Sequence, residues 1–68
     1  MSEIIFTVEE SPEGGFSARA LGVSIFTEAA SLAELHDRVR DAVRCQFDEA
    51  EKPRMIRLHF VRDEVIAA

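Results

Sequence analysis

The clearest hydrophobic pattern in the chain runs from Ser31 to Glu51 and repeats with the period of an α-helix. At about 100° per residue the apolar side chains fall on one stripe, which consists of Leu32, Leu35, Val39, Ala42, Val43 and Ala50. The acidic side chains Glu34, Asp37, Asp41 and Asp48 fall on the other side. Ser31 and Glu34 have the spacing of a capping box, and Pro53 ends the helix. We expect this amphipathic helix to cover a sheet.

The residues before this helix alternate between apolar and polar with the period of a β-strand. Ile4, Phe6 and Val8 share the buried face of a first strand. Residues 11–15, Ser-Pro-Glu-Gly-Gly, predict a tight connection, because proline presets φ and the two glycines allow positive φ. A second strand over residues 16–21 should therefore return antiparallel to the first.

Two further strands complete the pattern. Gly22 predicts a second tight turn, after which residues 23–27 are rich in β-branched and aromatic side chains and predict a third strand. Residues 28–30 then lead into the helix. Residues 55–62 predict a fourth strand, parallel to the third if both join one sheet. Its apolar face carries Ile56, Leu58 and Phe60. The expected fold is α+β, a βββαβ unit with a four-stranded mixed sheet and one helix on one face, and residues 63–68 form either a frayed tail or a short extra turn.

Length and composition restrict what such a chain can be. Its 68 residues form a single domain, 1–68, and a chain of this size buries only roughly 60% of the surface that it exposes when unfolded. Cys45 is the only cysteine, which excludes an internal disulfide and fits a reducing cytoplasm. No apolar run approaches the ~20 residues of a membrane span, and the first residues lack the basic region of a signal peptide. We expect a soluble, cytoplasmic protein with no membrane partner.

The formal net charge of −5 bears on the class of partner. Binding to phosphate depends on cationic groups that displace counterions, so direct nucleic-acid binding is not expected. A basic protein partner fits this charge better. The acidity also has a simpler explanation, which is that it keeps a small protein soluble.

A single helix leaves the other face of the predicted sheet uncovered. That face would carry Ile5, Leu21, Phe26 and Val61 among polar residues. Exposed apolar groups on so small a chain suggest that the face pairs with a second surface, in a homodimer or a hetero-complex. The alternative is that they are scattered apolar surface residues of the kind that most proteins carry.

The residues with catalytic or binding chemistry form no recognisable catalytic or metal centre. His36 lies at the border of the helix–sheet contact, and no cysteine or second histidine stands at ligand spacing from it. Cys45 projects on the polar side of the helix without a neighbouring base. Arg57, His59 and Arg19 share one sheet face, where they could receive a carboxylate, a phosphate or an acidic strand, although a solvated face is the preferred explanation. We expect no catalytic residue, no metal and no cofactor.

Several short motifs follow one another in a recognisable order. They are Phe6-Thr7-Val8, then Glu13-Gly14-Gly15-Phe16-Ser17-Ala18-Arg19-Ala20, then Phe26-Thr27-Glu28, then Ser31-Leu32-Ala33-Glu34-Leu35 and Val39-Arg40-Asp41-Ala42-Val43. Together they resemble the HicB-like antitoxin family, which combines a strand, a GG-aromatic hairpin, a strand ending in threonine and a helix opening T/S-x-x-E. The match covers most of residues 4–47.

This resemblance implies a truncated ribonuclease-H-like βββαβ fold and a role as inhibitor of a small, basic, RNA-cleaving HicA toxin. In full-length members an appended ribbon-helix-helix or helix-turn-helix segment binds the operator. No such segment follows in the 68 residues, so operator binding is not expected, and the family's PxLPGC-type stretch is reduced to Leu21-Gly22-Val23. Ribonuclease activity is not expected either, because the first strand carries Ile4, Phe6 and Val8 where an active enzyme of that fold places a metal-binding carboxylate.

The sequence therefore predicts a non-enzymatic protein-binding module of the HicB-like kind, an antitoxin-like inhibitor of a small basic toxin that also forms homodimers. The predicted partner-binding residues are Arg19, Leu21, Phe26, Arg57 and His59. The alternative is a stand-alone homodimeric domain that binds a small ligand or regulates a metabolic enzyme. A neighbouring reading frame for a small basic protein would favour the first function, and its absence would favour the second.

Overall fold

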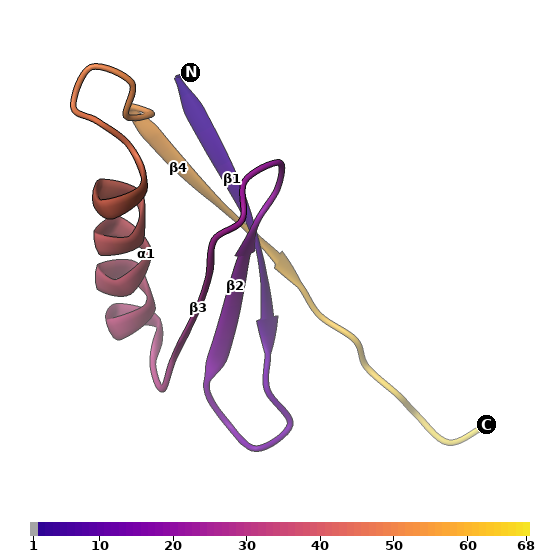
Figure 1. Ribbon diagram of the computed structural model, residues 1–68. Coiled ribbons are helices and arrows are strands. Elements are labelled where there is room, and N and C mark those ends of the chain that lie inside the picture. The colour runs from indigo at the N-terminus through magenta and orange to yellow at the C-terminus, as the bar shows by residue number, and fades with distance from the viewer. Residues whose placement is uncertain (1) are drawn as a thin grey trace.

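The computed structural model describes residues 2–68 and contains the expected order of elements, β-β-β-α-β. The strands are β1 (Glu3–Glu10), β2 (Phe16–Ala20), β3 (Phe26–Ala29) and β4 (Met55–Val61), and the helix is α1 (Leu32–Gln46). Figure 1 shows the helix on one side of a twisted sheet. The predicted α+β class and the single-helix βββαβ topology are confirmed.

The four strands form one mixed sheet in the order β3-β2-β1-β4. β1 pairs antiparallel with β2, with Val8 opposite Ala18, and parallel with β4, with Phe6 opposite Leu58. β3 and β4 thus run in the same direction on opposite edges of the sheet. The two strands joined through α1 are therefore parallel, as predicted, but two other strands separate them.

The β1–β2 connection has the backbone that its glycines predict. Gly14 and Gly15 have φ values of 98° and 88°, a left-handed conformation that side chains with a Cβ rarely adopt. Gly15 has a further restriction, because a Cβ at this position would lie 2.9 Å from the carbonyl oxygen of Ala29. The hairpin therefore fits closely against the end of β3, and only glycine fits at Gly15.

The third strand begins later in the chain than residues 23–27, so the predicted boundary is wrong. The backbone N–H of Ile25 donates to the carbonyl of Val23 at 2.9 Å, and the N–H of Ala20 donates to Ile25 at 3.0 Å. These bonds hold Val23 and Ile25 in the connection after Gly22, and β3 forms at Phe26–Ala29 instead. Val23 and Ile25 therefore belong to the turn and not to a strand, although both are β-branched. The side chain of Ile25 is still buried in the core.

The helix is shorter than the pattern Ser31–Glu51 predicts. It ends at Gln46, where Phe47 adopts an extended backbone and packs its ring partly against the core. Asp48 then opens a turn by accepting from the N–H of Lys52 at 2.8 Å, and Ala50 is exposed rather than part of the apolar stripe. Pro53 is buried beyond this turn, so the change of direction at Phe47 ends the helix.

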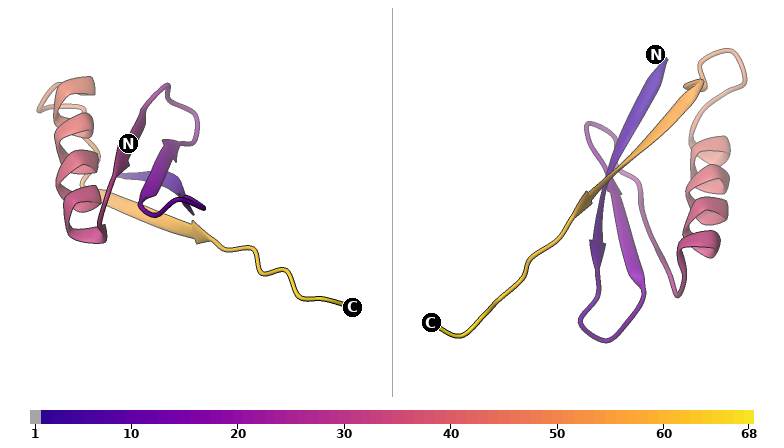
Figure 2. Two further views of the ribbon diagram at one scale, coloured as in Figure 1. Left: turned by 90° about the horizontal axis from the view of Figure 1, so that it is seen from below. Right: turned by 180° about the vertical axis from the view of Figure 1, so that it is seen from behind.

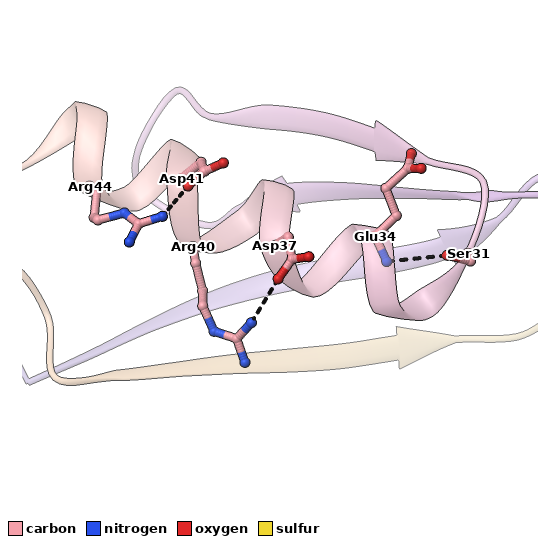
Figure 3. Close-up of polar contacts among 6 residues, drawn as sticks. All are labelled: Ser31, Glu34, Asp37, Arg40, Asp41 and Arg44. Atoms are coloured by element: carbon pink, nitrogen blue, oxygen red, sulfur yellow. Dashed lines mark hydrogen bonds and ion pairs between the residues drawn. The ribbon is translucent and has the colours of Figure 1, made fainter.

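The N-terminal cap of α1 contains one of the two hydrogen bonds of the predicted capping box, the bond to the Ser31 hydroxyl, whereas the Glu34 carboxylate binds a different N–H. The Ser31 hydroxyl accepts from the N–H of Glu34 at 3.2 Å (Figure 3). The Glu34 carboxylate accepts from the N–H of Ala30 at 3.3 Å instead of the N–H of Ser31, and it also pairs with Arg38 at 3.1 Å. The backbone N–H of Ala30 lowers the pKa of Glu34 most, and Arg38 lowers it further.

The ion pairs farther along the helix join residues three positions apart. Asp37 pairs with Arg40, and Asp41 pairs with Arg44 (Figure 3). The pair between Arg44 and Asp48 that an uninterrupted helix would form is absent from residues 2–68, because Asp48 lies beyond the helix end. These exposed pairs contribute little to stability.

The core lies between α1 and the part of the sheet nearest to β3. Its buried apolar residues are Ile4, Phe6, Val8, Ala18, Ala20, Ile25, Ala29, Leu35, Val39 and Val43. The helix packs chiefly on β3 and β2, and Figure 2 shows β4 diverging from it. Ile56 and Leu58 on β4 are consequently only half-buried, and Phe60 on the same face is 51% exposed. The helix thus covers only part of one sheet face.

β4 ends at Val61, one residue before the predicted end, and residues 63–68 form a tail, one of the two predicted alternatives, and no extra turn. They continue away from the end of β4 in extended form, which gives the molecule extents of 52 × 20 × 17 Å (Figures 1 and 2).

Candidate protein-binding surface

The sheet face opposite α1, called the open face here, is covered by no other element among residues 2–68. The strand registers arrange its side chains in rows, because directly paired residues point to the same side of a sheet. One row crosses all four strands and contains Phe26, Arg19, Thr7 and His59. The neighbouring row contains Leu21, Ile5 and Arg57. All five residues predicted to bind a partner therefore lie on the open face, in two adjacent rows.

Towards the β3 edge, the open face carries two exposed apolar side chains, Phe26 and Leu21, and the cationic side chain of Arg19. The Arg19 guanidinium lies 5.1 Å from the centre of the Phe26 ring, a cation–π contact that holds the two side chains together. Phe26 is 51% exposed and Leu21 is 55% exposed. Phenylalanine and arginine are both enriched in the centres of protein interfaces.

At the β4 edge, Arg57 has a partner on the neighbouring strand. Its Nε donates to Glu3 Oε1 at 2.5 Å, and its NH2 group donates to the second carboxylate oxygen at 3.4 Å. This hydrogen bond lowers the pKa of the Glu3 carboxyl and raises the pKa of Arg57, because each partner stabilises the charged form of the other. Glu3 is a residue of this surface that the sequence pattern did not single out.

Arg19, Arg57 and His59 do not converge on one anion site. Arg57 is bound to Glu3, and Arg19 is stacked on Phe26. His59 lies in the same row as Arg19 but two strands away, which corresponds to ~10 Å at the usual spacing of ~4.8 Å between strands. The open face is better suited to a broad, mixed contact with a protein than to capture of a single phosphate.

Beside Phe26, four carboxylates gather at the hairpin end of the sheet. Glu9 and Glu10 end β1, Glu13 lies in the hairpin, and Glu28 lies on β3 next to the same shallow depression. None of the four forms an ion pair within the described part of the chain. The sequence did not predict this cluster, because the hairpin register brings Glu9 and Glu28 into one row through Ser17.

The remaining candidates for site chemistry stand apart from one another. His36 is exposed on α1, and Cys45 is an exposed free thiol on the same helix. Residues 2–68 contain no group of three or more His, Cys, Asp or Glu side chains placed to hold a metal ion. In that same range, no helix has the length and apolar character needed to cross a membrane.

Two proteins similar to this chain place it in a family. A UPF0150 protein of Archaeoglobus fulgidus is 56% identical over 52 residues, which cover 76% of this chain and 77% of the relative. The chain belongs to the UPF0150 family. A second UPF0150 protein, from Thermotoga maritima, is 40% identical over 65 residues, covering 96% of this chain and 91% of the relative.

The UPF0150 relatives carry no description of activity or partner in their names. No family model matches the chain, and no solved structure matches it significantly. Neither name refers to HicB, so the resemblance to HicB-like antitoxins stays a prediction.

Proposed function

We propose that this UPF0150 protein is a protein-binding module whose open face receives a basic partner protein. The observation that carries the proposal is the uncovered sheet face, on which Phe26 and Leu21 are each more than half exposed beside Arg19. A small domain that leaves large apolar groups together on one side gains stability when a partner removes them from water.

The electrostatics support a basic partner. Glu9, Glu13 and Glu28 lie at the hairpin end of the open face without forming internal ion pairs in the described range, and the whole chain carries a net charge of −5. Complementary charge speeds association and excludes acidic competitors. An apolar centre with an acidic border therefore suits a cationic protein surface.

The HicB resemblance supports a more specific proposal, which is antitoxin-like inhibition of a small, basic, RNA-cleaving toxin in the cytoplasm. We call this the finer function. The chain would act by occupying the toxin surface, without catalysis and without a cofactor. Phe26, Leu21 and Arg19 would form the centre of the contact, and Arg57 and His59 would extend it toward β4.

The test is affinity purification from the native cell with the wild-type chain and two variants. Phe26→Ala removes an exposed ring from the open face, and Leu32→Ala removes an exposed side chain, 42% accessible, from the helix. We expect a small basic protein to copurify with the wild type and with Leu32→Ala, and to bind Phe26→Ala at least about tenfold more weakly. Recovery of the same protein with equal yield by Phe26→Ala would refute the open face as the contact.

The partner then decides the finer function. Purified alone, it should cleave RNA, and a stoichiometric amount of the wild-type chain should stop the cleavage. A basic partner that binds the open face but has no ribonuclease activity would support the protein-binding function and refute the antitoxin role.

A further inference from the structure

The outer edge of β4 is a free edge of the sheet, since the strand order is β3-β2-β1-β4. The N–H of Met55 donates to the carbonyl of Ser2 at 3.0 Å, so Met55 directs its backbone groups inward. Alternate residues of a parallel strand bond to the same neighbour, so the backbone groups of Ile56, Leu58 and Phe60 point outward. This edge has no proline, and its unpaired N–H and C=O groups can pair with another strand.

A groove runs between the C-terminal half of α1 and the first half of β4, because the helix packs on β3 and β2 instead. Val39 and Val43 of α1 and Ile56 and Leu58 of β4 give it apolar walls, and its volume is about 460 Å³. The charged residues that line it are Arg40, Arg44, Lys52 and Arg54, and Figure 3 shows Arg40 on the side of α1 that faces β4. No carboxylate among residues 2–68 lines the groove itself, but three of these cations pair with carboxylates beside it, Arg40 with Asp37, Arg44 with Asp41 and Lys52 with Glu49. Within the described residues, Arg54 is the cation of the groove that forms no ion pair.

The segment that follows β4 has the complementary character. Asp63 and Glu64 are acidic, and Val65 and Ile66 are apolar side chains that are 94% and 79% exposed. The segment leaves β4 at the end opposite to the groove and runs away from the body of the molecule (Figures 1 and 2). Residues 61–68 contain no glycine or proline that would turn it back. It is therefore poorly placed to reach the groove of its own chain.

We propose that β4 pairs antiparallel with β4 of a second copy, so that residues 62–66 of each copy lie along the start of β4 of the other. A two-fold axis through an antiparallel pair brings the end of one strand to the beginning of its partner. The occupant of the β4 edge is thus a second copy of this chain, and each copy contributes the acidic, apolar segment that the other copy's groove and edge can receive.

A register centred on Phe60 places complementary side chains opposite one another. With Phe60 opposite Phe60 of the second copy, Asp63 of the second copy lies opposite Arg57, and Val65 of the second copy lies opposite Met55. Met55 is 63% exposed in the single chain, so this register covers an apolar residue with an apolar residue and pairs opposite charges. Glu64 of the second copy falls opposite Ile56, on the side of the sheet where the basic groove opens.

This arrangement is independent of the proposed function. The dimer is centred on the β4 edge and its groove, whereas the proposed partner contact centres on Phe26 at the opposite edge of the sheet. The two surfaces share Arg57, which lies at the margin of the partner contact, and neither experiment below changes that residue. Failure of the dimer would leave the partner contact untouched, and failure of the partner contact would leave the dimer untouched.

A cysteine cross-link tests the register directly in the full chain with the native thiol removed by Cys45→Ser. Phe60→Cys and Phe26→Cys are a matched pair, because both phenylalanines are 51% exposed at opposite edges of the sheet. Directly opposed residues of an antiparallel pair lie ~4.5–5.5 Å apart at Cα, within the range of a disulfide. We expect mild oxidation to convert Phe60→Cys to a covalent dimer and to leave Phe26→Cys largely monomeric. Equal cross-linking of the two variants, or cross-linking of Phe26→Cys alone, would overturn the proposal.

Sedimentation equilibrium of variants without introduced cysteines supplies the second measurement. The wild type should dimerise at micromolar concentration, and a Val65→Glu, Ile66→Glu double variant should dissociate with a constant at least about tenfold higher. Both side chains are exposed in the single chain, so circular dichroism should show an unchanged fold. A wild type that stays monomeric to high micromolar concentration, or a double variant that dimerises as well as the wild type, would contradict the arrangement.

Discussion

Replacing Leu35 with alanine tests the packing of α1 on the sheet most sharply. The Leu35 side chain is fully buried, with 0% of its surface accessible, and it lies among the largest enclosed residues of the core. Truncation of a buried leucine to alanine removes its transfer free energy and leaves a cavity, and this change typically costs ~2–5 kcal/mol. We expect a loss of about 3 kcal/mol in the free energy of unfolding. A chain of 68 residues has a total stability of roughly 3–10 kcal/mol, so this variant should lie close to its folding threshold.

Leu32→Ala provides the matched control on the same helix. Leu32 belongs to the same sequence stripe but is 42% exposed, so its truncation should cost about 1 kcal/mol or less. Urea denaturation followed by circular dichroism measures both variants, at equal chain concentration because any dimer would make the midpoint concentration-dependent. Equal losses for the two variants, or a larger loss for Leu32→Ala, would refute the observed position of α1 on the sheet.

Two further predictions concern backbone conformation and pH. Gly15→Ala should destabilise the domain by ~2 kcal/mol or more, because the new Cβ would lie 2.9 Å from the Ala29 carbonyl oxygen at a φ of 88°. Gly14→Ala should cost only ~1 kcal/mol, because no atom lies within 4 Å of its Cβ position. Similar thermal midpoints for the two variants would contradict this prediction. Glu34→Gln should destabilise the protein at neutral pH, because the N–H of Ala30 and the guanidinium of Arg38 lower the folded-state pKa of Glu34 below 4.5. A lowered pKa contributes stability above the unfolded value and loses it as pH falls through the folded value, so the difference between wild type and variant should shrink as pH falls below the ordinary range of a glutamate carboxyl. A constant difference in urea midpoint would contradict this prediction.

The sequence predicted those parts of the fold that depend on local periodicity. The alternation of Ile4, Phe6 and Val8 is that of a strand with one buried face, and the spacing of Leu35, Val39 and Val43 is that of a helix stripe. Both signals reflect how side chains project from a regular backbone. For this reason the sequence alone predicts the order of elements and the single helix correctly.

The predictions that were wrong concern features that depend on tertiary contacts. Ile56, Leu58 and Phe60 alternate in the same way as the residues of β1, yet they remain partly exposed because α1 packs toward β3. The pattern of one strand cannot tell which part of the sheet a helix will cover. The helix end at Gln46 likewise follows from the packing of Phe47 against the core, which periodicity does not contain.

On the open face, too, the sequence predicted which side of the sheet a residue occupies but not which residues contact one another. Alternation alone placed Arg19, Leu21 and Phe26 on the open face. The contact between Arg19 and Phe26, and the approach of Glu9 to Glu28 at the hairpin end, depend on the registers of three strands. Register is set by turn geometry and by the match of whole strands, so a single strand's sequence does not reveal these groupings.

The most direct test of the open face as a contact surface is an NMR titration of the isotope-labelled chain with its purified basic partner. We predict that the signals of Leu21, Phe26 and Arg19 shift or broaden, and that signals from the exposed side of α1, such as those of Asp37 and Asp41, stay in place. Changes confined to the helix, with the open face unaffected at saturation, would contradict the account.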